Sequence, residues 1–344
     1  MKALRRFQKS PRAARIEDVP IPEPGPSQVL LKVHFCGVCG SDLHAYLNHP
    51  GYESVLEKVT FGHEVSGVVE SVGANAGDWQ PGDRAIITAI QPTDPDCPYV
   101  QSGRPQLSPS RRVQGLHLDG GMAEYIIVDQ QFLIGIPSSL ELLDAALTEP
   151  LSVADHCVVN CSSIRQDDKV IVSGPGIIGM LCAIVARQLG ANVIVSGTEA
   201  DSRIRLAAAQ EIGFQTVTVG PEHPPLHTQA NSLFGSEADA LVEASGAAPA
   251  LSDSWQAIRM DGSVTIVALY GHNVSLDVTQ FVRKQIDIQT SYGSALPSYK
   301  RALDMLTEGI VPVECLVRTY KLEEAITAFC HAANQEVMKP ILEC

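Results

Sequence analysis

The chain has 344 residues, of which 45% are hydrophobic and 19% charged, a composition typical of a globular protein. This length is more than a single hydrophobic core usually supports, so we expect two domains. The formal net charge of −14 argues against a broad nucleic-acid-binding surface and against an acidic membrane as a partner.

The ends and the cysteines indicate a compartment. Residues 1–6 are basic, but no apolar run follows them, and no stretch of about 18 apolar residues predicts a membrane span. The nine cysteines are irregularly spaced and do not resemble a disulfide framework. We therefore expect a cytoplasmic, reducing location.

The first part of the chain is predicted to be rich in β-structure. Segments 29–33 and 65–69 have the composition of strands, and Gly and Pro residues separate such segments. This pattern is typical of a small barrel or sandwich. A loop rich in Pro, Ser and Arg follows at 91–112, then a strand at 126–128 and a helical stretch at 144–160.

From Lys169 onward the pattern changes to alternating strands and helices. A strand at 170–172, a glycine-rich turn, a helix at 178–189 and a strand at 193–195 form a βαβ unit. Further strands are expected at 240–243 and 263–267, so the sequence predicts an α/β fold with a doubly wound parallel sheet. The last 50 residues return to a mixed pattern, with helices at 298–308 and 322–333 and a strand at 339–342.

Three separate segments carry side chains of the types that bind Zn²⁺. Thiol, imidazole and carboxylate are zinc ligands, and a catalytic zinc keeps one position open. The candidates for the metal are Cys39, His63, Glu64 and Glu149. Ser41, Asp42 and His44 follow Cys39 closely: a hydroxyl and an imidazole suited to move a proton, and a carboxylate suited to orient His63.

The glycine-rich turn predicts a dinucleotide site. It follows a strand and opens a helix, which is the context that gives a GxGxxG motif its meaning. Its residues are Gly174, Pro175, Gly176, Ile177, Ile178 and Gly179. At the end of the next strand, Glu199 favours NAD through the ribose hydroxyls, whereas Thr198 with Arg203 or Arg205 favours NADP. We expect NAD, with NADP as the open alternative.

At these residues the chain resembles a known family. Gly62-His63-Glu64 with Gly67 and Gly73 resembles the zinc signature of the medium-chain dehydrogenase/reductase superfamily, the zinc alcohol dehydrogenases. The segments 39–44 and 149–152 resemble its polyol and threonine dehydrogenase branch. The resemblance covers nearly the whole chain and implies a GroES-like catalytic domain at 1–152, a Rossmann NAD(P)-binding domain at 153–293 and a return to the catalytic domain at 294–344.

The resemblance also implies a reaction. One Zn²⁺ would be held by Cys39, His63 and one or both glutamates in turn, and would acidify the hydroxyl of a secondary alcohol or polyol, which becomes a ketone as hydride passes to NAD(P). Ser41 and His44 match positions that remove the proton in relatives. Lys339 matches a basic position that contacts the pyrophosphate, the alternative being a surface lysine.

Two further expectations concern a structural zinc and the alternative functions. Relatives carry four cysteines for a structural zinc in the loop at 91–112, and the same spacing here falls on Asp94, Cys97, Val100 and Ser108, so we expect no structural zinc. The alternatives are a zinc-free quinone or enoyl reductase on the same fold and a non-catalytic redox sensor. We expect a homodimer or homotetramer that acts on a small alcohol.

Overall fold

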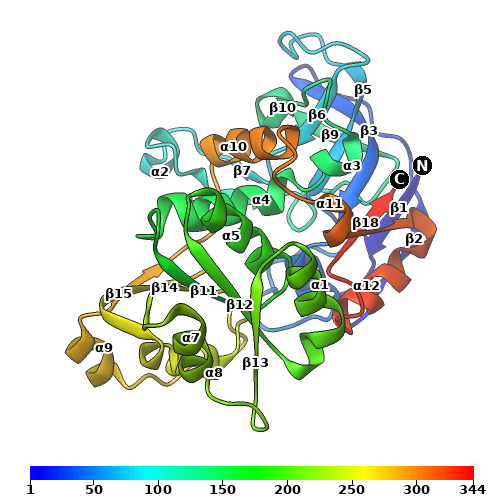
Figure 1. Cartoon of the computed structure of the whole chain (residues 1–344). Coiled ribbons are helices and arrows are strands. Elements are labelled where there is room, and N and C mark those ends of the chain that lie inside the picture. The colour runs from blue at the N-terminus through cyan, green and yellow to red at the C-terminus, as the bar shows by residue number, and fades with distance from the viewer. The chain divides into compact units, whose positions relative to one another are not determined.

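The computed structural model describes all 344 residues, which form two compact units. Unit 1 comprises residues 1–150, 294–313 and 317–344, and unit 2 comprises residues 151–293 and 314–316. In Figure 1, unit 1 therefore holds the blue to cyan elements and the orange to red ones, whereas unit 2 holds mainly green and yellow elements. Every helix of the chain is too short or too polar to cross a lipid bilayer.

Unit 1 is built on a seven-stranded sheet that joins the two ends of the chain. The C-terminal strand pairs antiparallel with a strand near the N-terminus, so Leu342 lies opposite Cys36. The sheet runs in the order β10 (Leu133–Gly135), β6 (Arg84–Ile87), β5 (Glu64–Val72), β3 (Gln28–Gly37), β18 (Lys339–Glu343), β17 (Val317–Lys321), and β9 (Tyr125–Asp129) also pairs with β3. Two small sheets complete it, β2 (Ala14–Asp18), β1 (Lys2–Arg6), β4 (Val59–Thr60) and the pair β7 (Ile90–Pro92), β8 (Arg111–Val113).

The helices of unit 1 are short and pack on these strands. The core between them is made of aliphatic and aromatic side chains, with Phe61 and Phe329 fully buried and tilted against each other. Such burial is the main driving force for this packing. The helices are α1 (Gly40–Tyr46), α2 (Pro98–Gln101), α3 (Leu142–Ala145), α10 (Leu296–Thr307) and α12 (Ala325–Ala333). α4 (Thr148–Asp155) and α11 (Val313–Leu316) each contain a boundary between the units.

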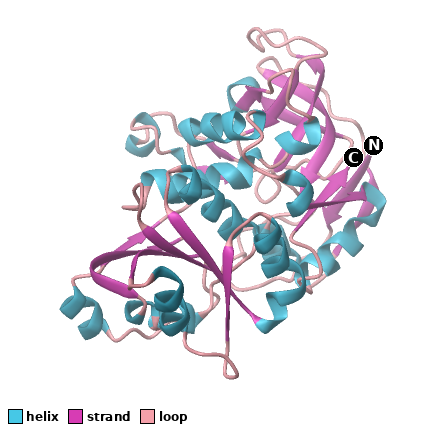
Figure 2. Cartoon of the chain, in the orientation of Figure 1, coloured by secondary structure: helices cyan, strands magenta, loops and turns pink.

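Unit 2 is a six-stranded parallel sheet with helices on both faces (Figure 2). Its strand order, third, second, first, fourth, fifth and sixth along the chain, is that of the dinucleotide-binding Rossmann fold. The strands in this order are β13 (Gln215–Val219), β12 (Asn192–Thr198), β11 (Lys169–Ser173), β14 (Ala238–Glu243), β15 (Ile258–Ile266) and β16 (Asp287–Thr290). The α-helices are α5 (Ile177–Gln188), α6 (Ala207–Glu211), α7 (Leu226–Phe234), α8 (Ala248–Ser252) and α9 (Val278–Lys284).

The structure confirms the predicted fold class but corrects one helix. The stretch predicted as one helix at 144–160 is broken between α3 and α4, and its end is a π-helix over His156–Asn160. The helix was predicted from the spacing of apolar residues in this stretch. A break of two residues disturbs that spacing little, so periodicity could not reveal the break. The break places Glu149 in the first turn of α4.

Candidate metal centre and dinucleotide site

Cys39 lies where a central strand of unit 1 turns into a helix. β3 ends at Gly37 and α1 begins at Gly40, with extended backbone at Cys39 (φ −84°, ψ 156°). The backbone N–H of Cys39 donates to Asp42 Oδ2 at 3.1 Å, which satisfies one of the unpaired donors at the helix start. Asp42 is fully buried, so this short helix fixes the place of the thiol.

His63 and Glu64 lie opposite this turn, at the start of β5. Gly62 before them has φ +97°, and a Cβ there would come within 2.5 Å of Cys36 Sγ and 2.6 Å of Met122 Cγ. Only glycine adopts this conformation without strain and leaves that space. In the antiparallel pair β3 and β5, Glu64 lies beside Gly37, whose missing side chain leaves room for the Glu64 carboxylate.

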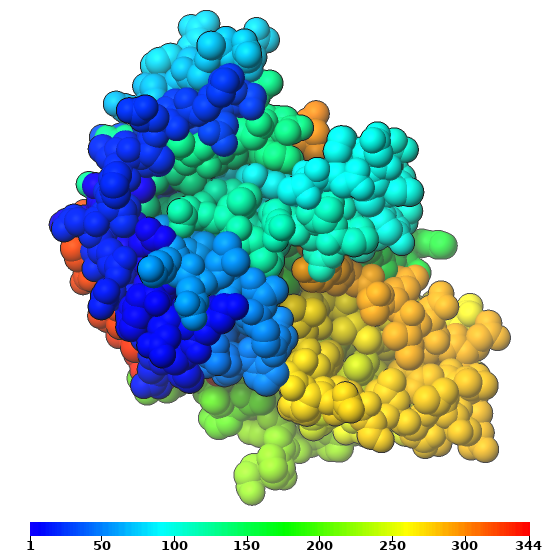
Figure 3. All heavy atoms as spheres, turned by 180° about the vertical axis from the view of Figure 1, so that it is seen from behind, coloured from blue at the N-terminus to red at the C-terminus, as the bar shows by residue number.

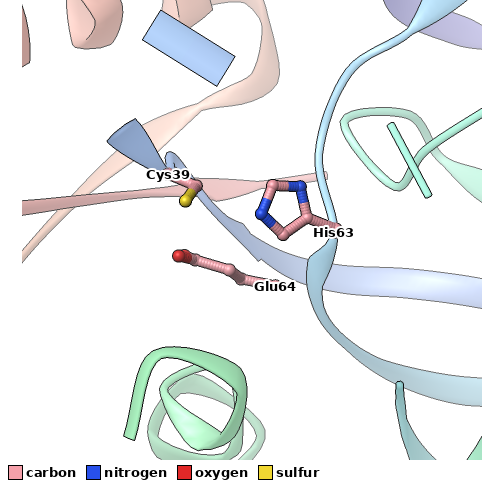
Figure 4. A group of neighbouring side chains, drawn as sticks. All are labelled: Cys39, His63 and Glu64. Carbon is pink, nitrogen blue, oxygen red and sulfur yellow. The ribbon is translucent and has the colours of Figure 1, made fainter. Parts of the chain in front are cut away.

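The two segments bring three ligand-type side chains together. One ligand atom each from Cys39, His63 and Glu64 lie within 4.8 Å of one another, and the three side chains point toward a common centre (Figure 4). His63 and Glu64 are buried and Cys39 is half-buried. Thiolate, imidazole and carboxylate form a donor set that fits zinc. Glu149, the fourth candidate, is not part of this close group.

The two ring nitrogens of His63 have different surroundings. Nε2 lies 3.4 Å from Ser41 Oγ, while Nδ1 lies 3.7 Å from Asp42 Oδ1, too far for a hydrogen bond, and has no other partner. Burial alone would lower the pKa of His63, but the negative charges of Asp42, Cys39 and Glu149 outweigh it and raise the pKa well above its usual value. The same field that favours a proton here favours a bound cation, and protons and metal compete for the ring.

Glu149 belongs to the same electrostatic environment. Its side chain is half-buried, and the loss of hydration together with the nearby carboxylate of Glu64 raises its pKa to about 7, against the opposing effects of His63 and Lys339. A carboxylate with such a pKa changes its charge near neutrality and keeps the negative charge of the site low when no cation is present.

Lys339 lies beneath the metal candidates, buried on β18. Its Nζ donates to the Val38 carbonyl at 2.9 Å and forms an ion pair with Glu64. Both partners are only 1% exposed, so the alternative of a surface lysine is wrong. A contact with the pyrophosphate stays a prediction, because the ammonium group is held by Glu64 in this structure.

The candidates for proton transfer share one turn of α1. Ser41 and His44 are three residues apart, so they lie on the same face of the helix. His44 Nδ1 lies 2.8 Å from Nδ1 of His49, and its ring stacks on Tyr52 with centroids 5.3 Å apart. Burial and the neighbouring His49 lower the pKa of His44. His49 is not among the residues that the sequence motifs single out.

The glycine-rich turn connects β11 to α5 in unit 2. Gly174 has φ +101°, and a Cβ there would lie 2.6 Å from the Ser245 backbone. A side chain at Gly179 would collide with the carbonyl of Gly174, whereas nothing lies within 4 Å of the place where a Cβ of Gly176 would stand. Gly176 precedes the first residues of α5, Ile177 and Ile178, so open space adjoins a helix N-terminus suited to a pyrophosphate.

The residues after β12 are organised by an aspartate that the sequence did not single out. The Thr198 N–H and hydroxyl both donate to Asp201 Oδ2, at 2.9 and 2.8 Å, and Arg205 pairs with its other oxygen at 3.2 Å. Glu199 stays exposed and pairs with His223 at 3.2 Å. Two of the groups that would favour a 2′-phosphate, Thr198 and Arg205, are thus engaged, and only Arg203 is not.

Comparisons with known proteins agree with both halves of this picture. The alcohol dehydrogenase GroES-like domain model matches residues 25–138 and the zinc-binding dehydrogenase model matches residues 178–308. The chain is 32% identical over 344 residues to a sorbitol dehydrogenase from Halalkalibacterium halodurans, covering 99% of each chain. The chain belongs to the zinc-binding, medium-chain alcohol dehydrogenase family.

Solved structures show how far this medium-chain dehydrogenase shares its fold. The 2R,3R-butanediol dehydrogenase from Bacillus subtilis superimposes with a TM-score of 0.90 at 27% identity, over 100% of this chain and 99% of that one. A zinc-binding dehydrogenase from Sinorhizobium meliloti 1021 bound to NADP gives 0.88 at 29% identity, over the same shares. The protein is therefore an NAD(P)-dependent oxidoreductase of this family.

The loop at 91–112 departs from what the family resemblance implies for a structural zinc. It forms a cyan lobe on the surface in Figure 3 and contains β7, α2 and β8. Cys97 is 6% exposed, and a hydrogen bond with Ser108 lowers the pKa of its thiol. Thr93 Oγ1 donates to the Ser110 carbonyl at 3.0 Å, and Gln91 Nε2 donates to Gln114 Oε1 at 2.7 Å. Hydrogen bonds between residues of this lobe thus close it.

Proposed function

We propose that this dehydrogenase oxidises a secondary alcohol or polyol to a ketone, reversibly, with one zinc per chain and NAD as the preferred hydride acceptor. The observation that carries the proposal is the close group of half-buried Cys39 with buried His63 and Glu64, together with the Ser41 hydroxyl 3.4 Å from His63 Nε2. The sorbitol and butanediol dehydrogenases among its relatives support a polyol or secondary alcohol as substrate.

The residues of unit 1 have distinct tasks in this reaction. Zinc held by Cys39, His63 and a glutamate would acidify the substrate hydroxyl, and the bound nicotinamide would accept the hydride. Asp42, 3.7 Å from His63 Nδ1, orients the imidazole so that Nε2 faces the site. Ser41 holds the hydroxyl of the substrate and passes its proton toward His44 on the same helix face.

The charges around the donor set suit a divalent cation. Three acidic groups, Cys39, Glu64 and Glu149, face one fixed ammonium group, Lys339. With Lys339 paired to Glu64, Glu149 is the alternative carboxylate for the metal, in keeping with its pKa near neutrality. Either glutamate completes a three-ligand set that leaves a position for the substrate.

A pair of cysteine variants tests the metal assignment. In Cys39→Ala, zinc content falls below one per chain, and kcat/KM on a panel of polyols and secondary alcohols falls by about 10³-fold or more, which corresponds to ~4 kcal/mol of lost stabilisation of the transition state. Cys97→Ala is the matched control, since it removes a buried thiol outside the donor set, and it keeps one zinc and wild-type turnover. Two zincs in the wild type, or a zinc lost in Cys97→Ala, would contradict the assignment.

The preference for NAD rests on Glu199. Its carboxylate follows β12 directly, where it accepts hydrogen bonds from ribose hydroxyls and repels a 2′-phosphate. Glu199→Gln is expected to shift the ratio of the NADH and NADPH dissociation constants about three- to tenfold toward NADPH, a modest effect because the side chain is 76% exposed. Glu222→Gln, which removes an exposed carboxylate beside His223, is the control and leaves the ratio unchanged.

Assembly and location are proposed on general grounds. We expect a homodimer or homotetramer, which sedimentation velocity would show. All nine cysteines are free thiols in the structure, which supports a reducing, cytoplasmic location.

A further inference from the structure

His44 and His49 form a close contact at the end of α1. The two Nδ1 atoms are 2.8 Å apart, with ring centroids 5.1 Å apart and planes inclined by 52°. Two unprotonated nitrogens repel each other at this distance, so one of them must carry a hydrogen atom and donate it to the other. His44 is half-buried and His49 is exposed, so the pair leads from the site toward solvent.

The turn after α1 is built to hold this pair. Asn48 adopts a left-handed conformation (φ +54°), and its side-chain oxygen accepts a hydrogen bond from Arg6 at 2.7 Å. The backbone N–H of His49 then donates to the His44 carbonyl at 2.9 Å, which folds His49 back over the end of the helix. Tyr52 stacks on the ring of His44. The contact between His44 and His49 is therefore held by an ordered turn and is more than a chance meeting of two side chains.

We propose that His49 is the outer member of a two-imidazole relay, through which the proton of the substrate hydroxyl leaves His44 for water. This inference rests on the proposed function, because it supposes an alcohol whose proton reaches His44. His49 touches neither substrate nor cofactor and acts through His44.

The transfer balances with one proton in and one proton out. In the resting pair, His44 carries its hydrogen on Nδ1 and donates it to His49 Nδ1, while His49 carries its own hydrogen on Nε2. A proton enters at His44 Nε2, the ring nitrogen that does not face His49. The shared proton passes to His49 Nδ1, and the proton on His49 Nε2 goes to water. After the product leaves, His44 Nε2 gives its proton to water, the shared proton returns from His49 Nδ1 to His44 Nδ1, and water protonates His49 Nε2, so both rings return to their starting state.

The electrostatic surroundings suit transfer outward. Burial, and then His49, lower the pKa of His44, so a proton received there is passed on readily. Tyr52 is the titratable side chain that stacks on His44, and His49 is the neighbouring charge that acts on the pKa of His44. The charged groups of the same turn are engaged elsewhere, Arg6 with Asn48 and the Val55 carbonyl, and Glu53 with the Gly51 N–H.

Two substitutions of His49 separate relay from positioning. In His49→Asn the amide oxygen still accepts a hydrogen bond from His44 Nδ1 but cannot pass a proton, whereas His49→Ala removes both functions. His34→Asn, a change of a half-buried histidine of β3 outside the pair, is the control. We expect His49→Asn to slow single-turnover alcohol oxidation at pH 7 about tenfold, less than the roughly 10²–10⁴-fold of a side chain that touches the reacting group, because water replaces part of the path.

Three readouts decide the matter. The relay requires that the lost rate in His49→Asn and His49→Ala returns on addition of imidazole, that the pH profile of the rate shifts, and that KM and zinc content stay unchanged. If His49→Asn has the wild-type rate and profile, or if imidazole restores nothing, the relay is wrong and His49 only positions His44.

A spectroscopic measurement keeps the relay and the proposed function apart. Nitrogen NMR of the histidine-labelled, zinc-loaded protein is expected to show His44 as the Nδ1–H form and His49 as the Nε2–H form, independent of turnover. Other protonation forms would overturn the relay even in an active enzyme. Absence of turnover with every alcohol, with these forms present, would instead contradict the proposed function.

Discussion

The buried ion pair between Lys339 and Glu64 gives a quantitative prediction about the metal centre. Lys339→Met keeps the length of the side chain and removes its charge, which leaves the Glu64 carboxylate buried near Cys39 and Glu149. Both partners are 1% exposed, so water screens the ion pair very little. Breaking a buried pair from one side typically costs about 3–5 kcal/mol of unfolding free energy, because the remaining charge is uncompensated. We expect this loss in zinc-free protein.

Bound zinc should remove most of that cost, since a cation then compensates Glu64. The zinc-loaded Lys339→Met protein is therefore expected to lose much less stability than the zinc-free protein, and its zinc affinity should rise by the same difference. The double variant Lys339→Met with Glu64→Gln should recover most of the loss without zinc, as a double-mutant cycle would show.

The chain offers a clean assay for this effect. It has two tryptophans, and Trp79 packs on the core of unit 1 while Trp255 packs on that of unit 2. In a Trp255→Phe background, urea unfolding followed by fluorescence reports on unit 1 alone. A zinc-free Lys339→Met protein within about 1 kcal/mol of its parent would refute the reasoning, because a buried pair cannot be lost so cheaply from one side.

Three further predictions follow from individual contacts. Glu149 has a pKa raised from 4.5 to about 7, so the folded zinc-free protein binds more protons than the unfolded chain in this range, and its stability falls as pH rises from about 4.5 to 7. Glu149→Gln removes this dependence of stability on pH. Its unfolding free energy relative to wild type should therefore rise by about 3 kcal/mol across that range, at ~1.4 kcal/mol per pKa unit. Parallel curves of unfolding free energy against pH for the two proteins would contradict the assignment. Gly174→Ala forces a side chain onto the Ser245 backbone at φ +101°. We expect NADH binding, measured by nucleotide fluorescence, to weaken at least about tenfold while zinc content is unchanged. An NADH affinity equal to that of the wild type would argue against the proposed cofactor turn. Tyr270→Phe removes the hydroxyl that donates to Glu243 at 2.5 Å, one of several donors around this buried carboxylate. We expect the unfolding free energy of unit 2, measured in a Trp79→Phe background, to fall by about 1–3 kcal/mol. The unfolding of unit 1 should not change.

Much of the candidate site could be read from the sequence because its parts are contiguous. The Cys39 to His44 turn, the Gly62-His63-Glu64 strand start and the glycine-rich turn each need special residues at fixed spacing. The reason is local: a helix start favours a capping polar side chain, the backbone at Gly62 and Gly174 (φ +97° and +101°) favours glycine, and a pyrophosphate favours an open helix N-terminus. The alternation of strand and helix likewise predicted the parallel sheet, since parallel strands require crossover connections.

The tertiary structure decided which side chains meet, both across distant parts of the chain and within single turns. Lys339 reaches Glu64 only because β18 pairs with β3, a contact across about 300 residues that no local pattern encodes. Asp201 binds Thr198 and Arg205, three and four residues away, through the turn that follows β12. His49 meets His44 through a left-handed residue at Asn48. The ligand types were visible in the sequence. The charges that balance them became visible only in the fold, because side-chain pairing is set by packing and burial in three dimensions.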